Sequence, residues 1–300
     1  MNPKLPADSL VSPAHRHALR QLLAHPRFEV LPLDGIVDDA VAHLPVGATV
    51  TITASPTRGP GPTLETTEDL ASQGFRAVPH LAATQHRVGS LPHTMGRLQA
   101  AGIQEVFVVG GDQADGLASR GKGTASQDAA FASGWELLAA VHRLAPELKL
   151  GVPGYPEGHP KISQRTLDES LTQKAERASC VVGQLCFDPQ TVSDWATGLR
   201  ARGVNLPVYA GVPGAVGSAR LLRIAGRIGV GDSLRFLASG KAGLAMRLAT
   251  SGHFDPTPLV AGLVSKGDVV SGLHLYTFNA LKETEIWRQR LLTWLEEGDH

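Results

Sequence analysis

The sequence has few cysteines, few aromatic residues and no excess of charge of either sign. Its 300 residues contain 28 Lys and Arg against 28 Asp and Glu, so the formal net charge is zero. A chain without a basic excess has little with which to neutralise the phosphates of a nucleic acid, and no nucleic-acid partner is expected. Charged residues make up 19% and hydrophobic residues 42% of the chain, which excludes a disordered chain or a coiled coil.

The two cysteines, Cys180 and Cys186, lie in one apolar run, where an extended strand would hold them about 20 Å apart. A disulfide between them is excluded at that distance. No apolar stretch approaches the roughly 20 residues that cross a bilayer, and the N-terminal segment lacks the apolar core of a signal peptide. These absences predict a cytoplasmic protein of a reducing compartment, with no membrane partner.

What the sequence does contain is a regular alternation of short apolar runs and helical stretches. A first helix is predicted where Ser12 can cap, Pro13 suits the first helical position, and leucines follow at helical spacing. Eight β-branched or apolar runs come after it, each bounded by Gly, Pro or polar residues. They cover residues 28–32, 49–54, 76–81, 105–110, 148–154, 180–187, 206–211 and 270–278.

Strands that alternate with helices predict βαβ units and a parallel sheet, and eight units predict a closed (β/α)8 TIM barrel, an α/β fold. We expect a single domain over residues 1–300, with a leading helix over 1–26 and the barrel over 27–300. Leu, Ala and Arg at helical spacing over residues 220–267 predict a helical insertion before the last strand. A doubly wound open sheet is the alternative, and it would have to place two further strands at its edges.

In a (β/α)8 barrel, catalytic residues lie at the carboxyl ends of the strands and in the loops that follow. Glu29 is out of phase with Phe28 and Val30, so its side chain faces the opposite side of the sheet from theirs. If that side is the barrel interior, burial of the carboxyl group favours its neutral form and suits a general acid. The alternative is an outward Glu29 that pairs with a helix lysine.

Other strand ends carry further polar residues. The second strand ends at Thr53 and the third at His80, and each of these alone is more often structural. The fourth strand leads into Gly110 and Gly111, which allow close approach of the backbone to a ligand, and Asp112, a hydrogen-bond acceptor. This turn is also an ordinary loop start.

The fifth, sixth and eighth strands add aromatic and amide groups. The loop GYPEGHP holds Tyr155 and His159 between two prolines, a composition typical of ligand contacts but also of a rigid turn. Gln184 lies among apolar neighbours, where its amide needs partners from a ligand or from the backbone. In the last strand His274 and Tyr276 alternate with leucines, so one of the two faces lines the barrel.

Several common motifs are absent. The spacing of His80, His86 and His93 matches no metal-binding pattern, and no metal site is predicted. The chain has no phosphate-binding P-loop and no G-x-S-x-G nucleophile elbow. Gly229 and Gly231 fall in a helical stretch, so they do not form a dinucleotide fingerprint.

Taken in order, a series of short motifs resembles the 5,10-methylenetetrahydrofolate reductase family over nearly the whole chain. The motifs are FEVLP, PHL, VVGGD, FASG, GYPEGHP, GQLCFD, YAGVPG and HLYTFN. Single pieces are weak, whereas GYPEGHP, GQLCFD and HLYTFN at similar spacing are specific. The resemblance implies a (β/α)8 barrel and an oxidoreductase of one-carbon metabolism and methionine biosynthesis. Such an enzyme reduces methylenetetrahydrofolate to methyltetrahydrofolate with hydride from NADH or NADPH.

The resemblance also implies roles for individual residues. Glu29 resembles the acid that protonates the folate ring so that an iminium forms and accepts hydride. Asp112 resembles the aspartate that faces the pterin, and Gln184 resembles the glutamine that hydrogen-bonds it. Lys174 matches a flavin lysine if one residue is deleted nearby. The remaining matches are positions that contact the flavin in FAD-containing members: Thr53, His80, Ala132, Tyr155, His159, Asp168 and Tyr276.

Three departures from the family pattern concern the cofactor. Gly110 and Ala280 stand where arginines are usual, and Phe131 stands where a tyrosine is usual. A pyrophosphate without these cations loses charge-assisted hydrogen bonds of roughly 1.5 to 3 kcal/mol each. We therefore expect direct hydride transfer from NADH or NADPH, held by residues such as His80, Tyr155 and His159, without stably bound FAD.

Other functions stay open at this point. The ordinary FAD-dependent reductase requires other arginines, such as Arg120 or Arg165, to replace those missing. A lyase or aldolase would need a Schiff-base lysine at a strand end, and no predicted strand ends in lysine. A non-catalytic folate-binding barrel is the third alternative. An apolar stripe in the last helix fits a homo-oligomer interface but is more often core; its members are Trp287, Leu291, Leu292, Trp294 and Leu295.

Overall fold

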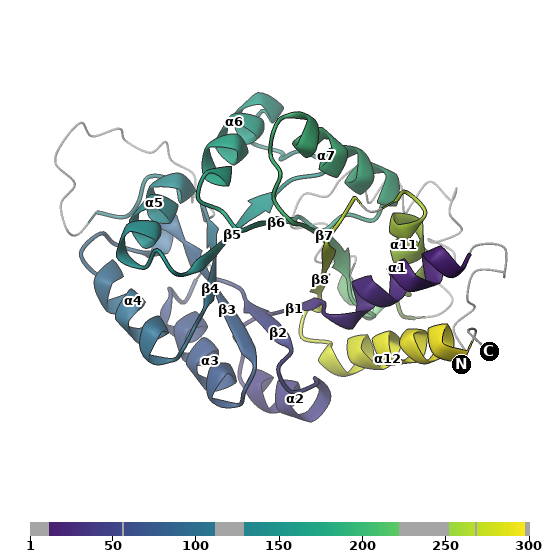
Figure 1. The fold of residues 1–300 in the computed structure, drawn as a ribbon. Coiled ribbons are helices and arrows are strands. Elements are labelled where there is room, and N and C mark those ends of the chain that lie inside the picture. Colours follow the sequence, from purple (N-terminus) through teal and green to yellow (C-terminus); the bar gives the residue numbers. More distant parts are fainter. Residues whose placement is uncertain (1–11, 56, 112–128, 222–251, 268, 298–300) are drawn as a thin grey trace. The chain divides into compact units, whose positions relative to one another are not determined.

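The computed structural model describes residues 12–55, 57–111, 129–221, 252–267 and 269–297. Within these residues eight parallel strands form a closed barrel whose neighbours follow chain order (Figure 1). The predicted (β/α)8 barrel and its eight strands are confirmed, with ends shifted by a few residues. The strands are β1 (Arg27–Val30), β2 (Thr49–Ile52), β3 (Arg76–Ala82), β4 (Glu105–Val109), β5 (Lys149–Gly154), β6 (Cys180–Gly183), β7 (Val208–Pro213) and β8 (Gly272–Tyr276).

Helices follow the strands as the alternating sequence pattern predicts. They are α1 (Pro13–Ala24), α2 (Ile36–His43), α3 (Gly61–Ser72), α4 (Leu91–Ala100), α5 (Gly134–Leu144), α6 (Gln164–Ala175), α7 (Pro189–Ala201), α11 (Thr257–Val264) and α12 (Leu281–Glu297). Helix α11 lies in the predicted insertion before the last strand. Residues 222–251 of that insertion lie outside the described residues.

The leading helix α1 begins as its sequence predicts. The Ser12 hydroxyl accepts a hydrogen bond from the backbone N–H of His15 at 3.2 Å, and Pro13 occupies the first turn. Helix α1 contacts α12, and the two lie side by side in Figure 1. An Arg20 nitrogen donates to the Leu295 carbonyl at 2.9 Å across this contact. The apolar side of α1 is therefore buried against the end of the chain.

The chain divides into two compact units that both contribute strands to the barrel. The first unit consists of Met1–Glu29, Gly154–Asp168 and Val182–His300, and the second of Val30–Pro153 and Glu169–Val181. The division cuts through β1, β5 and β6, so neither unit is a continuous stretch of chain. The prediction of one domain over residues 1–300 stays a prediction.

In the first unit, one face of β1, β7 and β8 carries polar and aromatic side chains. Arg27 lies opposite His274 in the β1–β8 ladder. Its guanidinium lies 4.2 Å from the ring centroid of Tyr209 on β7, across Gly272 of β8. Side chains from strands two apart meet on the concave side of a curved sheet, so this face is the barrel interior. Glu29, two residues after Arg27, shares it.

In the second unit, side chains from β4 and β6 also meet on one face of the sheet. A Cβ added to Gly151 of β5 would lie 2.7 Å from the Phe107 ring, so only glycine leaves room for that ring. The Cys180 thiol on β6 lies 3.7 Å from a Glu105 carboxylate oxygen on β4. This face is therefore the inner one, and it also carries His80, which lies opposite Phe107.

The cysteines and the last helix meet their predictions. Cys180 and Cys186 are both buried, and no disulfide joins them. In α12, Trp287, Leu291 and Leu295 are buried, which confirms a core role for that part of the stripe. The oligomeric state stays a prediction.

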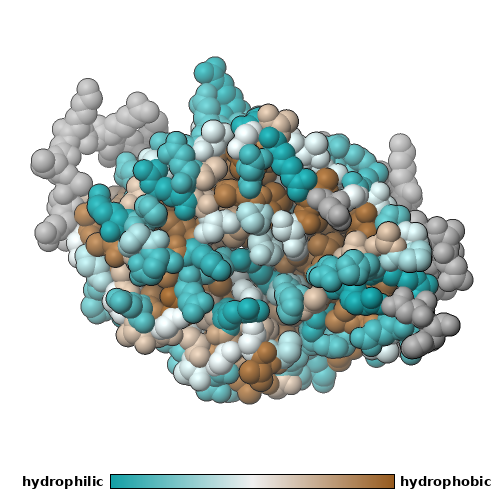
Figure 2. Space-filling model, viewed as in Figure 1, coloured by the Kyte–Doolittle hydropathy of each residue, from teal (hydrophilic) through white to brown (hydrophobic). Residues whose placement is uncertain are grey.

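The described surface mixes residue types. In Figure 2, hydrophobic residues are visible in several places among hydrophilic ones. The exposed large hydrophobic residues include Leu33, Val41 and Val46, and scattered exposure of this kind is normal. None of the described helices combines the length and the apolar character that a bilayer-crossing segment requires.

Candidate functional site

The carboxyl group of Glu29 faces the barrel interior and contacts a histidine of the neighbouring strand. Its Oε2 lies 3.0 Å from Nε2 of His274, and the two side chains are 14% and 2% exposed. The inward orientation predicted from the strand phase is thus confirmed. The outward Glu29 with a helix lysine is not what the structure shows.

His274 is bonded at one ring nitrogen only. Its Nδ1 is buried and has no hydrogen-bond partner among the described residues. An imidazole whose Nε2 meets a carboxyl group has two arrangements: Nε2–H donates to the carboxylate, or the protonated carboxyl donates to Nε2. In either arrangement this contact holds the Glu29 carboxyl group against the His274 ring on the inner face.

Tyr276 completes this face of β8. Its ring meets the His274 ring edge-on at a centroid distance of 4.9 Å, and its hydroxyl donates to the Gly183 carbonyl at 3.2 Å. Burial, then the nearby charge of Glu29, raises the pKa of the Tyr276 phenol well above its ordinary value. The phenol therefore stays protonated. Of the two faces of strand eight, the one with His274 and Tyr276 lines the barrel.

The turn after β8 holds the backbone of Glu29. The Thr277 hydroxyl donates to the Glu29 carbonyl and accepts from the Asn279 N–H at 3.2 Å. Phe278 and Asn279 have φ of 49° and 62°, in the left-handed region that non-glycine residues seldom adopt. Phe278 packs in an apolar cluster with Leu185, which keeps this strained turn in place.

Gln184 follows β6, still in the first unit. Its backbone N–H donates to the Gly154 carbonyl at 2.8 Å, and its side-chain oxygen accepts from the Leu185 N–H at 2.9 Å. The backbone thus supplies the partner that the sequence required for the amide oxygen. The amide Nε2 has no protein partner in the described part of the chain, so it can donate to a ligand.

The GYPEGHP loop brings Tyr155 and His159 together. Their rings meet edge-on at 5.3 Å, and Nδ1 of His159 accepts from the Lys161 N–H at 3.1 Å. Gly158 has φ of 76° and donates to the Tyr155 carbonyl, which closes the turn that a side-chain-bearing residue would strain. The loop is therefore a rigid turn that also presents two rings.

Asp168, predicted as a cofactor contact, is bonded within the chain. Its carboxylate lies 3.3 Å from a nitrogen of Arg202, the residue that follows α7, and 3.0 Å from Nε2 of Gln164, one turn earlier on α6. The Arg202 side chain is 39% exposed and that of Asp168 is 30% exposed. Asp168 thus links α6 to the end of α7.

In the second unit, Thr53 directly follows β2, and His80 lies on the neighbouring strand β3. The backbone N–H of Thr53 donates to the Val30 carbonyl at 3.0 Å, and its hydroxyl oxygen is buried without a hydrogen-bond partner in the described residues. His80 is 8% exposed and packs on Phe107 at a ring distance of 4.7 Å. Both predicted residues therefore lie on the inner side of this unit.

The other predicted cofactor residues of the second unit are Ala132 and Lys174, which differ in their contacts. The exposed Ala132 donates its N–H to the Glu136 carboxylate at 3.0 Å, and Ser133 caps α5 by accepting from the Glu136 N–H. The backbone of Ala132 is therefore engaged in capping α5. Burial lowers the pKa of the Lys174 ammonium on α6.

The Gly110–Gly111 turn is described only in part, because Asp112 lies outside the described residues. Gly111 has φ of 84°, and a Cβ there would lie 2.1 Å from the Thr84 hydroxyl oxygen. This position therefore requires glycine on both backbone and steric grounds.

The predicted histidines do not converge. His86 is buried, with its Nδ1 3.1 Å from the Ala82 carbonyl, whereas His93 is exposed. In the stretches that the structure describes, no three His, Cys, Asp or Glu side chains gather as metal ligands would.

Two features of the site were missed by the sequence reasoning. His274 was placed on the strand that lines the barrel but was not assigned to Glu29, and Thr277 was not singled out at all. The signal for His274 lies in barrel closure, because β8 must pair with β1 once eight strands close in chain order. No sequence pattern distinguishes Thr277 from other threonines.

Comparison with known proteins gives both family and fold. A family model described as Methylenetetrahydrofolate reductase matches residues 37–232. Methylenetetrahydrofolate reductase 2 of Saccharomyces cerevisiae (strain ATCC 204508 / S288c) is 22% identical over 240 residues, which cover 73% of this chain and 37% of the yeast protein. The chain thus spans little more than a third of that curated relative.

Solved structures resemble the chain in fold alone, because the identities are low. A protein from Clostridium thermocellum that binds two copies of 5-methyl-5,6,7,8-tetrahydrofolic acid has a TM-score of 0.53 at 11% identity. The match covers 93% of this chain and 98% of that one. Oxaloacetate acetylhydrolase has a TM-score of 0.51 at 11% identity, with 95% and 88% covered.

Proposed function

Because this chain belongs to the methylenetetrahydrofolate reductase family, we propose that it reduces 5,10-methylenetetrahydrofolate to 5-methyltetrahydrofolate with NADH or NADPH. The observation that carries the proposal is the contact between Glu29 and His274 on the barrel interior. A largely enclosed carboxyl group beside an imidazole is suited to general acid catalysis. The substrate needs that help, because its methylene carbon bridges two nitrogens and accepts hydride only after one of the two bonds opens.

The reaction then balances in two steps. Glu29 gives its proton to one ring nitrogen, the bond from that nitrogen to the methylene carbon breaks, and an iminium forms at the other nitrogen. Hydride from the dihydronicotinamide adds to the iminium carbon, which becomes the methyl group, and NAD(P)⁺ is released. His274 holds the carboxyl group in place and can return a proton to it for the next turnover.

Recognition of the folate falls to neighbouring polar groups in this proposal. The amide Nε2 of Gln184 donates to the pterin, whose edge is rich in acceptors. The phenol of Tyr276 stays protonated and lies next to the His274 ring, so it provides an uncharged surface for the substrate. Asp112 is the proposed partner for the donors of the pterin.

The residues at the family's flavin positions fit FAD poorly. A Cβ added at Gly110 would meet nothing within 4 Å among the described residues, so the backbone there does not itself require glycine in place of the usual arginine. Ala280 provides no cation at the second arginine position. The Asp168 carboxylate is bonded to Arg202, and the Ala132 N–H to Glu136. These observations support a reductase without stably bound FAD, in which NAD(P)H passes hydride directly to the folate.

Thr53 and His80 of the second unit are proposed as contacts of the nicotinamide dinucleotide. The Thr53 hydroxyl is without a protein partner, and the His80 ring lies on the inner face beside Phe107. In the first unit, Tyr155 and His159 offer ring surface to the same class of ligand. Lys174 is a further proposed contact, because its partly buried ammonium could pair with a phosphate.

The test is oxidation of NADH or NADPH by the purified protein when methylenetetrahydrofolate is added, with no flavin supplied and the flavin content of the same sample measured. Turnover by flavin-free protein is expected. Turnover only after FAD is added would restore the FAD-dependent mechanism. Folate binding with no turnover under either condition would replace the reductase with a folate-binding protein.

A further inference from the structure

Strand β2 presents two threonine hydroxyls that the protein itself does not satisfy. Thr51 and Thr53 share one face, alternating with Val50 and Ile52, and both hydroxyl oxygens are buried without a hydrogen-bond partner among the described residues. Buried hydroxyls in native proteins almost always have a partner, so such groups call for a ligand or an ordered water. Thr53 directly follows Ile52, the last residue of β2, at the carboxyl end of the strand, where ligands of a (β/α)8 barrel bind.

The backbone of Thr53 is held on both sides. Its N–H donates to the Val30 carbonyl at 3.0 Å, and its carbonyl accepts from the Thr63 hydroxyl at 2.9 Å. Thr63 is 1% exposed, in the first turn of α3. Fixing both peptide groups of a residue fixes its φ and ψ, and with them the direction of its side chain.

The segment after Thr53 is held as well. Nε2 of Gln85 donates to the Ser55 carbonyl at 2.6 Å, and the Ser55 hydroxyl accepts from the Arg58 N–H at 3.2 Å. The Arg58 guanidinium donates in turn to the Pro32 carbonyl. The side-chain bond from Thr63 therefore acts on Thr53 itself, while the bonds of Gln85, Ser55 and Arg58 hold the turn that follows.

We propose that Thr63 is a positioning residue for nucleotide binding: by holding the Thr53 carbonyl, it aims the Thr53 hydroxyl at the nicotinamide dinucleotide. The proposal rests on the proposed function, because Thr53 serves this purpose only if the nucleotide binds there. Thr63 makes no contact with the nucleotide in this account and acts through Thr53 alone.

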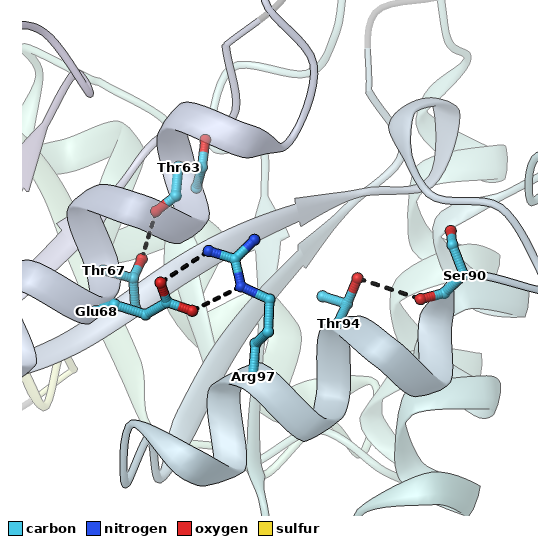
Figure 3. A network of polar contacts seen from close by, with 6 residues as sticks. All are labelled: Thr63, Thr67, Glu68, Ser90, Thr94 and Arg97. Carbon is cyan, nitrogen blue, oxygen red and sulfur yellow. Dashed lines mark hydrogen bonds and ion pairs between the residues drawn. The ribbon is translucent and has the colours of Figure 1, made fainter.

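The next turn of α3 supplies a matched control. The Thr67 hydroxyl donates to the Thr63 carbonyl at 2.6 Å, and Thr67 is 0% exposed (Figure 3). The two threonines are thus equally buried on the same helix, and each hydroxyl donates to one carbonyl. Of these two hydroxyls, that of Thr63 bonds to a group outside α3, the carbonyl of Thr53.

The experiment compares Thr63→Val, Thr67→Val, Thr63→Ser and Thr53→Val in the full chain. It measures the Kd for NADH and for NADPH by fluorescence titration, together with kcat and Tm. Thr53→Val and Thr63→Val are expected to raise the Kd about three- to tenfold, the range for one neutral hydrogen bond. Thr67→Val should lower Tm by about as much as Thr63→Val does, but it should leave the Kd at the wild-type value. Thr63→Ser keeps the hydroxyl and should return the Kd to the wild-type value.

Two outcomes would overturn the proposal and separate it from the proposed function. If the wild type turns over but Thr63→Val and Thr67→Val have equal effects on the Kd, Thr63 is merely structural and the reductase function stands. If the wild type turns over but Thr53→Val leaves the Kd unchanged, Thr53 does not bind the nucleotide and the positioning role falls with it. If the wild type neither binds nucleotide nor turns over, both proposals fail.

Discussion

The strand ends at Glu29 and Thr53 have the same backbone arrangement and differ in their side chains. In the first unit, the carbonyl of Glu29 accepts from the Thr277 hydroxyl. In the second, the carbonyl of Thr53 accepts from the Thr63 hydroxyl. Both donors are buried, at 0% and 1% exposure. A threonine from a separate element thus fixes each of the two residues.

The side chains of the two strand ends differ in their partners. Glu29 contacts Nε2 of His274, whereas the Thr53 hydroxyl has no partner among the described residues. A group that is already bonded to the protein is held ready for a chemical step. A buried group that still needs a bond is suited to binding. Substitutions at Glu29 and the groups that hold it should therefore change kcat, and those at Thr53 and Thr63 should change nucleotide affinity.

The largest effect is expected from Glu29→Gln. A glutamine keeps the shape of the side chain but has no proton to give to the folate nitrogen. Removal of a general acid should lower kcat by roughly 10²- to 10⁴-fold. Steady-state NADH oxidation with methylenetetrahydrofolate measures this.

Glu105→Gln is the matched control, because Glu105 also lies on the inner face and contacts Cys180. It should leave kcat within about twofold of the wild type, since surface and non-site changes seldom alter the chemical step. Similar losses in both variants would show that any inner carboxyl group matters, and the special role of Glu29 would be lost.

The next effect is expected from His274→Asn, which leaves Glu29 in place without the imidazole. Loss of the hydrogen bond that holds the Glu29 carboxyl group, worth roughly 1.5 to 3 kcal/mol when one partner is charged, should lower kcat about tenfold or more. The control is His43→Asn, because His43 forms a comparable pair with Asp39 at 3.4 Å on α2. If His43→Asn lowered kcat as much as His274→Asn does, the pairing with Glu29 would have no particular importance.

Thr277→Val tests whether the backbone bond to Glu29 affects chemistry more than binding. We expect kcat to fall about three- to tenfold, the range for one neutral hydrogen bond, with the Kd for NADH unchanged. Thr257→Val in α11 is the control, because the buried Thr257 hydroxyl accepts from the Trp287 indole at 2.9 Å in the same unit. A rise in Kd without a fall in kcat would remove the difference between the two strand ends.

The fold was predictable because its signals are local. Short apolar runs separated by helical stretches predict each βα unit, and Ser12 with Pro13 predicts the start of α1. The phase of Glu29 within its strand predicted its inward side chain. Each of these inferences uses residues that are near one another in the sequence.

The contacts that complete the site could not be predicted in the same way. Glu29 and His274 are 245 residues apart and meet only because β8 pairs with β1. A helix residue such as Thr63 reaches a strand end only through the packing of α3. Similarity to a family also does not show what a residue contacts. Asp168 matches a cofactor position, yet its carboxylate bonds Arg202, a partner that no local pattern reveals.

The smallest effect is expected from Arg97→Gln. This substitution tests whether the loss of any contact between α3 and a neighbouring helix changes nucleotide binding at Thr53. Arg97 of α4 donates two hydrogen bonds of 2.7 Å to Glu68 of α3 (Figure 3). The side chains are 30% and 33% exposed, so solvent screening limits the loss of unfolding free energy to about 0.3 to 1 kcal/mol. The Kd for NADH should be unchanged, and a rise like that of Thr63→Val would mean that the specific bond to Thr53 is not what matters.

The effect of Arg97→Gln on the free energy of unfolding should depend on pH, and this dependence identifies the bond that was removed. The hydrogen bond from Arg97 lowers the pKa of the Glu68 carboxyl below its ordinary value of 4.5. Since the folded pKa is the lower one, the stabilisation is present above pH 4.5 and is lost as the pH falls through the folded pKa. Urea unfolding of wild type and Arg97→Gln should therefore differ at neutral pH and converge in acid. A difference that stays constant with pH would mean that the charge of Glu68 has no part in joining α3 to α4.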